Sequence, residues 1–159
     1  MIPLEDAQTH VMESIKTLES ESVHLLQGRN RVITEPIMSN ESIPPFDNTA
    51  VDGYAVKAID TKGVTEETPT SLTVLETIAA GKPPTFTIQP GECSKIMTGA
   101  PIPDGADAVV MVERTEQQEN ESLVTIKEEV SEGRHIRRSG EDLEPGDLVI
   151  PQGLSLIHI

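Results

Sequence analysis

The chain has 159 residues, with 12 Lys and Arg against 27 Asp and Glu, so its formal net charge is −15. This length suits one domain or two small ones, and the negative charge argues against binding to nucleic-acid backbones or anionic membrane surfaces. With no Trp, one Tyr and two Phe, the core must be aliphatic.

No stretch approaches the roughly 18 consecutive apolar residues that a membrane-spanning helix needs. The N-terminus lacks the basic segment and apolar core of a secretory signal. These features predict a soluble, cytoplasmic protein. The single cysteine, Cys93, cannot form a disulfide within the chain, and we interpret it as a small residue buried in a strand.

The first segment has a helical pattern. Apolar residues recur at steps of three and four from Leu4 to Leu18, which predicts an amphipathic helix of about four turns. Glu5 and Asp6 fall in its first turn, where negative charge complements the helix dipole. A second, shorter helix could follow over residues 23–33, although Gly28 disfavours it.

The pattern changes at Pro36, because Pro36, Pro44 and Pro45 cannot lie inside one continuous helix. We place a boundary near Pro44. Downstream, short β-branched segments alternate with Gly- and Pro-rich turns, which is typical of a small all-β unit. The expected strands are residues 54–56, 71–78, 94–97, 108–113, 123–127 and 147–150.

Polar side chains gather in three turn-rich stretches at the ends of these strands, where functional loops usually lie. The first stretch, residues 44–56, contains Asp47, Asn48 and Asp52. Asp47 and Asn48 can form an Asx-turn, and Asp52 with Gly53 can turn the chain into a strand. Spacing alone favours this capping role over a catalytic or Mg²⁺-binding one.

The second stretch, residues 96–111, holds Thr98 and Gly99 at the end of an expected strand. Backbone N–H groups and a hydroxyl can converge at such a turn and form a concavity suited to an oxyanion. The alternative is a plain loop of Gly and Pro residues, which the pattern alone favours.

The third stretch, residues 133–142, carries Arg134, Arg137 and Arg138 directly after a strongly acidic segment. Salt bridges to neighbouring carboxylates and the binding of an anion explain this basic cluster equally well. Asp142, just after the arginines, could orient them or hold a cation.

Taken together, the three stretches resemble one known family. The segments PPFDNTAVDGYAV, KIMTGAPIPDGADAVVMVE and IRRSGEDLEPGD, in this order and at these separations, are similar to those of molybdopterin molybdenumtransferase, the MoeA and gephyrin E-domain family. The resemblance runs from Leu4 to about Gly153. Three long motifs in register are far more specific than a single glycine pattern, so they favour the functional interpretations of the three stretches.

The resemblance implies a mainly β fold with an N-terminal helix. Residues 1–44 would begin an elongated α+β first domain, residues 45–136 would form an inserted, small β-barrel-like domain, and residues 137–159 would return to the first domain. The chain would be an N-terminal piece of a homodimeric enzyme more than twice as long, truncated before the α/β domain that binds the pterin. The aliphatic ending, residues 154–159, departs from the family and suggests truncation with a non-native tail.

The implied activity of the whole enzyme is the insertion of molybdate into adenylated molybdopterin with release of AMP, with Mg²⁺ required. Other proteins of molybdenum cofactor biosynthesis are expected partners. By motif position, Asp52, Thr98 and Asp142 are the expected catalytic residues. Asp52 and Asp142 would hold Mg²⁺, and Thr98 would donate a hydrogen bond to an oxyanion as the adenylate is cleaved. This piece alone is expected to be inactive.

The anionic substrates need local positive charge in so acidic a chain, and Arg137, Arg138 and Gly99 are the expected anion-binding residues. Two positions depart from the family. Many relatives read DNSAMDGYAV where this chain reads DNTAVDGYAV, and many carry a third arginine where Ser139 stands. The second change weakens the positive charge beside Arg137 and Arg138.

Two other functions are alternatives. The chain could be a non-catalytic scaffold module for protein interaction, of the gephyrin E-domain type. It could also be a stand-alone solute-binding β domain, which would fold as a stable monomer and bind molybdate unaided.

Overall fold

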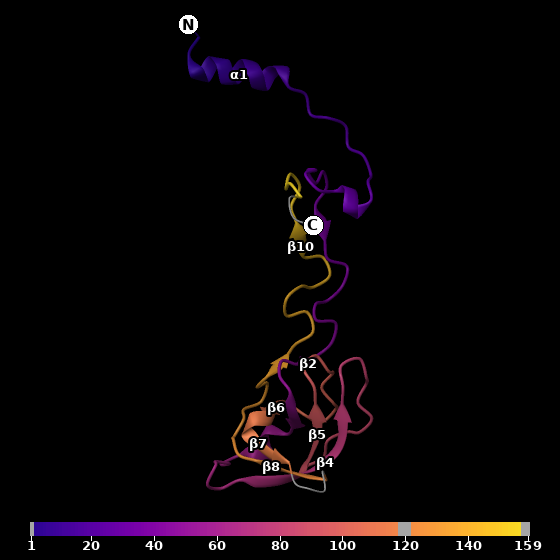
Figure 1. The fold of residues 1–159 in the computed structure, drawn as a ribbon, viewed down its shortest axis with the longest axis vertical. Coiled ribbons are helices and arrows are strands. Elements are labelled where there is room, and N and C mark those ends of the chain that lie inside the picture. Colours follow the sequence, from indigo (N-terminus) through magenta and orange to yellow (C-terminus); the bar gives the residue numbers. More distant parts are fainter. Residues whose placement is uncertain (1, 118–121, 157–159) are drawn as a thin grey trace. The chain divides into compact units, whose positions relative to one another are not determined.

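The structure is a computed structural model, and it describes residues 2–117 and 122–156. It is mainly β with one N-terminal α-helix (Figure 1), which confirms the expected fold class. Backbone contacts divide the chain into two units, one formed by Met1–Met38 with Leu148–Ile159 and the other by Ser39–Asp147. The first unit is discontinuous in sequence, and the second is continuous.

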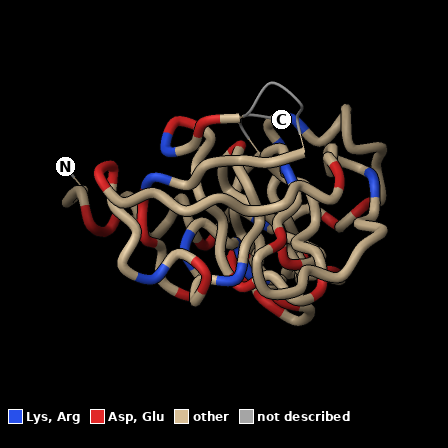
Figure 2. Tube along the Cα trace, turned by 90° about the horizontal axis from the view of Figure 1, so that it is seen from below, with Lys and Arg blue, Asp and Glu red and all other residues tan. Residues whose placement is uncertain are grey.

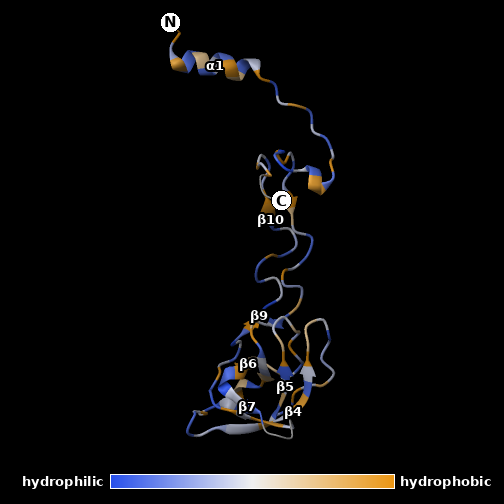
Figure 3. Ribbon diagram, in the orientation of Figure 1, coloured by the Kyte–Doolittle hydropathy of each residue, from blue (hydrophilic) through white to orange (hydrophobic). Residues whose placement is uncertain are grey.

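In the first unit, helix α1 spans Leu4–Ser14 and ends four residues before the expected position, Leu18. The Ser14 hydroxyl donates to the carbonyl oxygens of His10, at 2.6 Å, and Val11, at 3.0 Å, while Ile15 is already extended. These bonds satisfy carbonyls that a continuing helix would otherwise use. Apolar and polar residues alternate around α1, as Figure 3 shows, and none of them is buried.

The second expected helix is reduced to one 3₁₀ turn, η1 (Leu25–Gln27). The Leu26 N–H donates to Nδ1 of His24 at 3.3 Å, and Gly28 follows the turn as its C-cap. The expectation of a helix through residue 33 was therefore wrong, and Gly28 marks the place where the turn ends. Among the described residues, no helix is both long and apolar enough to cross a membrane.

The remaining backbone of this unit pairs its early part with its late part. Strands β1 (Ile37–Met38) and β10 (Leu148–Ile150) are antiparallel, and residues 30–33 exchange backbone hydrogen bonds with residues 153–156. Residues 154–156, at the start of the suspected tail, thus belong to a paired segment. Residues 157–159 lie outside the described residues.

The second unit is built on a six-stranded sheet in the order β6-β3-β5-β4-β8-β7. Neighbouring strands are antiparallel except for the parallel pair β4 and β5. The six expected strands are confirmed, with ends shifted by at most two residues. Besides β10, they are β3 (Gly53–Val56), β4 (Thr70–Ile78), β5 (Glu92–Ile96), β6 (Ala108–Met111) and β8 (Leu123–Ile126).

In the described part of the second unit, three short strands and two 3₁₀ turns were not expected from the sequence: β2 (Asn48–Thr49), β7 (Thr115–Gln117), β9 (Ile136–Arg137), η2 (Ala58–Thr61) and η3 (Val112–Arg114). Strands β2 and β9 form an antiparallel pair of their own. Two-residue strands are too short to show an alternating pattern, so their pairing is what defines them.

Apolar clusters are buried on both faces of the curled sheet. Tyr54 and Val56 enter one apolar cluster, while Ala55 between them enters the other. The side chains of successive residues in a strand point to opposite faces, so β3 is buried on both sides. Cys93 is fully buried in the first cluster, and this burial raises the pKa of its thiol to about 12. The interpretation of Cys93 as a buried residue is confirmed.

The limits of the second unit differ from the domain boundaries that the sequence placed at residues 44 and 136. The N–H groups of Asp142 and Leu143 both donate to the carbonyl oxygen of Ile43, so residues 39–44 and 137–147 belong with the sheet. At the edge of the unit, Ser39 donates to the Asp147 carbonyl and accepts from the Gly146 N–H, both at 2.8 Å. The first and last residues of the unit are therefore adjacent.

Candidate functional site

Asp52 and Thr98 meet at one end of the sheet. Gly53, at the start of β3, is paired with Ile96, at the end of the antiparallel strand β5. The residue before β3 and the residues after β5 therefore lie at the same end. There, Oδ1 of Asp52 accepts two hydrogen bonds from Thr98, one from its backbone N–H and one from its hydroxyl, both at 2.7 Å.

These two bonds hold Asp52 in its charged form. The Thr98 hydroxyl and then the Thr98 N–H lower the pKa of the carboxyl group below its ordinary value of 3.8. Both residues are exposed to solvent. The pair is thus an ionised carboxylate in a fixed orientation, with a hydroxyl beside it that any bound molecule can reach.

The turn after β5 uses its N–H groups within the protein. The Gly99 N–H donates to the Thr49 carbonyl oxygen, and the Ala100 N–H donates to that of Met97, both at 2.9 Å. With the Thr98 N–H bound to Asp52, all three N–H groups are occupied, so they do not form the open oxyanion concavity expected from the sequence. Gly99 instead supplies the turn with a φ of +79°. Its anion-binding role stays a prediction.

The arginine stretch forms a second cluster, centred on Asp47. Oδ2 of Asp47 accepts from Nη1 of Arg138 at 2.6 Å, and Oδ1 accepts from the Ser139 N–H at 2.8 Å. The Ser139 N–H and then Arg138 lower the pKa of the Asp47 carboxyl group below 3.8, with a smaller opposing effect of burial. Asp47 is therefore an ionised partner of Arg138.

Arg137 is paired as well. Its Nη2 lies 2.5 Å from Oδ2 of Asp142, and its Nε lies 3.9 Å from Glu141. Three carboxylates, those of Asp47, Glu141 and Asp142, thus face two guanidinium groups, and the cluster carries no net positive charge. Figure 2 likewise shows basic and acidic residues interspersed along the described part of the chain.

The salt-bridge interpretation of this stretch therefore holds in the structure. The side chains of Arg137 and Arg138 are 39% and 56% exposed, so their ion pairs are accessible to water. Exposed pairs contribute little to stability, which leaves the guanidinium groups able to exchange partners with an incoming anion. The anion-binding role of both arginines stays a prediction.

Strand β2 connects the two clusters. On one side, the Thr49 N–H donates to the Ala100 carbonyl oxygen at 3.1 Å, and on the other, Asn48 is paired with Arg137 of β9. The next residue, Ala50, donates to the His135 carbonyl oxygen at 2.9 Å. The short segment 47–50 thus holds the turn that carries Thr98 and the loop that carries the arginines.

The two expected Mg²⁺ ligands, Asp52 and Asp142, belong to different clusters. Among the described residues, no group of three or more His, Cys, Asp or Glu side chains could hold a metal ion. Mg²⁺ commonly takes one or two carboxylates and completes its shell with water and substrate phosphates. Oδ2 of Asp52 fits that role, because both bonds from Thr98 fall on Oδ1. Asp142 would first have to release Arg137.

Sequence reasoning missed Asp47 and Glu141 as site residues. It treated Asp47 as a turn-capping residue, whereas its carboxylate binds a residue 91 positions later in the chain. Glu141 accepts the Arg138 N–H at 2.9 Å and so closes the turn of residues 138–141. Both acidic residues lie inside the motifs quoted in the sequence analysis. The signal that could have identified them is their negative charge, which allows them to pair with the arginines.

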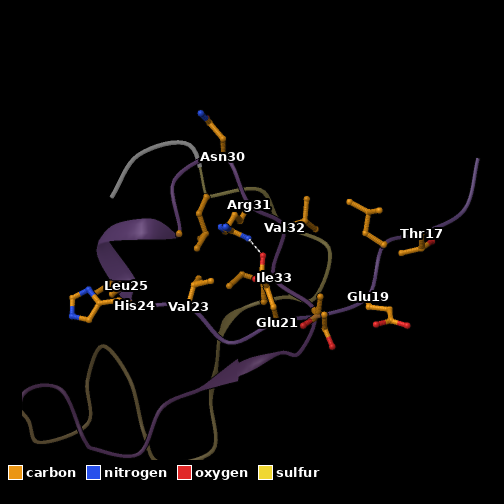
Figure 4. Close-up of a pocket in the computed structure, with 15 residues that line it drawn as sticks. Thr17, Glu19, Glu21, Val23, His24, Leu25, Asn30, Arg31, Val32 and Ile33 are labelled. Carbon is orange, nitrogen blue, oxygen red and sulfur yellow. Dashed lines mark hydrogen bonds and ion pairs between the residues drawn. The ribbon is translucent and has the colours of Figure 1, made fainter.

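A cavity of about 690 Å³ lies elsewhere, in the first unit (Figure 4). Its lining comes from residues 17–34 together with Leu156, and it includes the ion pair of Arg31 with Glu21. None of the residues expected from the sequence to act in catalysis or binding lines it. The cavity therefore does not mark the candidate site.

Comparison with known proteins identifies a matching family. Its sequence model, described as the MoeA N-terminal region (domain I and II), matches residues 2–158. The match includes all three motif stretches and most of the aliphatic ending, residues 154–159, for which the sequence predicts a non-native tail.

Curated relatives and solved structures agree with this match. Molybdopterin molybdenumtransferase 2 of Mycobacterium tuberculosis is 40% identical over 153 residues, which cover 96% of this chain and 37% of the relative. Molybdopterin molybdenumtransferase of Bacillus subtilis is 35% identical, with coverages of 96% and 36%. A crystal structure of the molybdopterin biosynthesis MoeA protein from Pyrococcus horikoshii OT3 is 35% identical and superimposes with a TM-score of 0.88, covering 96% of this chain and 40% of that one. The chain thus spans well under half the length of these relatives.

Proposed function

Because this chain belongs to the family of MoeA N-terminal regions, comprising domains I and II, we propose that it acts in molybdenum cofactor biosynthesis as part of a molybdopterin molybdenumtransferase. The proposed reaction inserts molybdate into adenylated molybdopterin and releases AMP. The observation that carries the proposal is the Asp52–Thr98 pair, an exposed, ionised carboxylate and hydroxyl held together at the end of the sheet. The relatives' names supply the reaction class.

In this proposal, the two bonds between Asp52 and Thr98 have different tasks. The Thr98 N–H keeps the carboxylate in place throughout. The Thr98 hydroxyl can rotate, so it can redirect its hydrogen bond from Asp52 to an oxyanion that develops as the adenylate is cleaved. The hydroxyl therefore starts as a partner of Asp52 and becomes the donor to the substrate, while the carboxylate remains fixed.

Oδ2 of Asp52 is the atom proposed to hold Mg²⁺. When bound, the ion would neutralise negative charge on the phosphate and molybdate oxygens. Arg137 and Arg138 are proposed to contact the same anionic substrates, Arg137 after exchanging its carboxylate partner and Arg138 through the N–H groups that do not bind Asp47. Asp142 would then orient Arg137 or share the ion.

The remaining predictions from the sequence are part of the same proposal. A homodimer, partners from the same biosynthetic route, a cytoplasmic location and a need for further domains all stay predictions. The relatives are named for the transferase, which gives no support to the scaffold alternative.

The test uses the intact gene product that contains this chain, purified as wild type and as Asp52→Asn. We expect molybdate-dependent release of AMP from adenylated molybdopterin, and a loss of about 100-fold or more in the variant, the size typical of a lost transition-state contact. Asp60→Asn is the matched control, because Asp60 also accepts a backbone N–H, that of Gly91 at 2.9 Å. Undiminished Mg²⁺-dependent AMP release by Asp52→Asn would refute the role of Asp52.

A complementation assay tests whether this chain needs further domains to be active. A strain deficient in molybdenum cofactor receives either the intact gene or the coding sequence of these 159 residues. Rescue is expected with the intact gene alone. Rescue by the 159-residue chain would contradict the need for further domains.

A further inference from the structure

Asp47 binds both halves of the candidate site, and the proposed function does not yet use it. Its carbonyl oxygen accepts the Ile102 N–H at 3.1 Å, on the side of the turn that carries Thr98. Its carboxylate accepts from Nη1 of Arg138 and from the Ser139 N–H on the other side. Backbone and side chain of one residue thus connect the two clusters.

The backbone of the arginine loop has other anchors besides the bond from the Ser139 N–H to Asp47. The Gly140 N–H donates to the Pro44 carbonyl oxygen at 2.9 Å, and the Asp142 N–H donates to that of Ile43 at 2.8 Å. Glu141 closes the turn by accepting the Arg138 N–H. Beyond the Ser139 bond, the Asp47 carboxylate therefore adds the position of the Arg138 guanidinium, whose long side chain has many rotamers to lose.

Asp47 has two opposing effects on the binding of an anion at Arg138. Its negative charge weakens the local attraction for an anion, but the cluster is exposed, and the high dielectric constant of water reduces the interaction between two charges to a small fraction of its value in a protein interior. Its contacts, on the other hand, fix the guanidinium before the substrate arrives, so less ordering is needed on binding. For a side chain as flexible and exposed as Arg138, the ordering is the larger effect.

We propose that Asp47 is a positioning residue that presets the Arg138 guanidinium for the phosphate or molybdate oxygens of the substrate. This inference rests on the proposed function, because it concerns the same anion-binding loop. It assigns Asp47 no contact with the substrate, only an action through Arg138.

The test measures steady-state AMP release by the intact gene product with adenylated molybdopterin as the varied substrate. Asp47→Asn keeps the size of the side chain and an oxygen that can accept the Ser139 N–H, but it loses the ion pair. We expect KM to rise about three- to tenfold, because the Arg138 side chain would then have to be ordered when the substrate binds. The value of kcat should change less than about twofold. The control variant Asp60→Asn, which lacks an arginine contact in the described structure, should leave KM unchanged.

A second variant separates positioning from a merely structural role. If Asp47 acts through Arg138, then Arg138→Gln raises KM, and adding Asp47→Asn to it raises KM no further. Independent, additive effects of the two substitutions would overturn the inference, since a structural role does not need Arg138.

The outcomes also separate this inference from the proposed function. An active wild type with an unchanged or lowered KM in Asp47→Asn overturns the inference alone. A lowered KM would mean that the carboxylate competes with the substrate for Arg138. A wild type that releases no AMP overturns the proposed function and this inference together.

Discussion

Gly53 is the position where a single methyl group should disturb the fold most directly. A Cβ added there would lie 2.0 Å from the carbonyl oxygen of Val110 and 2.9 Å from its carbonyl carbon. Both atoms belong to the backbone of β6, so no side chain can turn away. Gly53 is paired with Ile96 of β5 on its other side, and β3 therefore cannot move aside without breaking that pairing.

To remove the overlap in Gly53→Ala, the strands must separate by more than one ångström. Overpacking of a core costs about 1–3 kcal/mol when side chains can adjust, so we expect a loss of about 3 kcal/mol or more from the free energy of unfolding here. For a unit of this size, that loss lowers Tm by more than about 10 °C. Asp52 precedes Gly53 directly, so its bonds to Thr98 should weaken as well.

Thermal unfolding followed by circular dichroism measures this effect. Gly63→Ala is the control, because Gly63 has a φ of +75° and no atom within 4 Å of an added Cβ. It should cost only the strain of a left-handed alanine, about 1–2 kcal/mol. If Gly53→Ala unfolds within a few degrees of the wild type, the close approach of β3 and β6 is refuted.

Two other predictions follow from buried and charged groups. The Ser94 hydroxyl is fully buried, and no hydrogen-bond partner is found for it in the described part of the chain. Ser94→Ala should therefore raise the free energy of unfolding by about 1 kcal/mol, whereas Ser71→Ala, at an exposed position of β4, should not; equal Tm shifts would contradict this. The second prediction concerns the stability of the protein at acidic pH. The folded pKa of Asp52 is below 3.8, so its stabilising effect is complete above that pH and is lost as the pH falls through the lower, folded value. Asp52→Asn should consequently lose less stability than the wild type between about pH 4 and pH 2 in a urea titration, and parallel losses would count against it.

The parts of the fold that the sequence could predict are those with a local signal. β4 is long and rich in β-branched residues, and its expected and observed limits differ by one residue. Strands β2 and β9 have two residues each and form only because the chain folds back on itself, so no local pattern reveals them. The end of α1 was misplaced because periodicity identifies the apolar face of a helix, while the Ser14 hydroxyl decides where it ends.

In the candidate site, too, residues with a local sequence signal could be predicted and their long-range contacts could not. Motif positions identified Asp52 and Thr98 separately, but their bond joins residues 46 positions apart and depends on the register of β3 with β5. The sequence likewise identified Arg138 without its partner Asp47. Charge alone could not choose among the many nearby carboxylates, because that choice is made by the pairing of β2 with β9.

The meeting of Ser39 with Asp147 has a practical consequence for protein engineering. Chain segments whose ends lie together can often be excised or grafted without disturbing their interior. Residues 39–147 contain every residue assigned to the candidate site, and their two ends are already joined by a pair of hydrogen bonds. This segment is therefore a natural cassette, which could be exchanged between relatives to transplant the site as one piece.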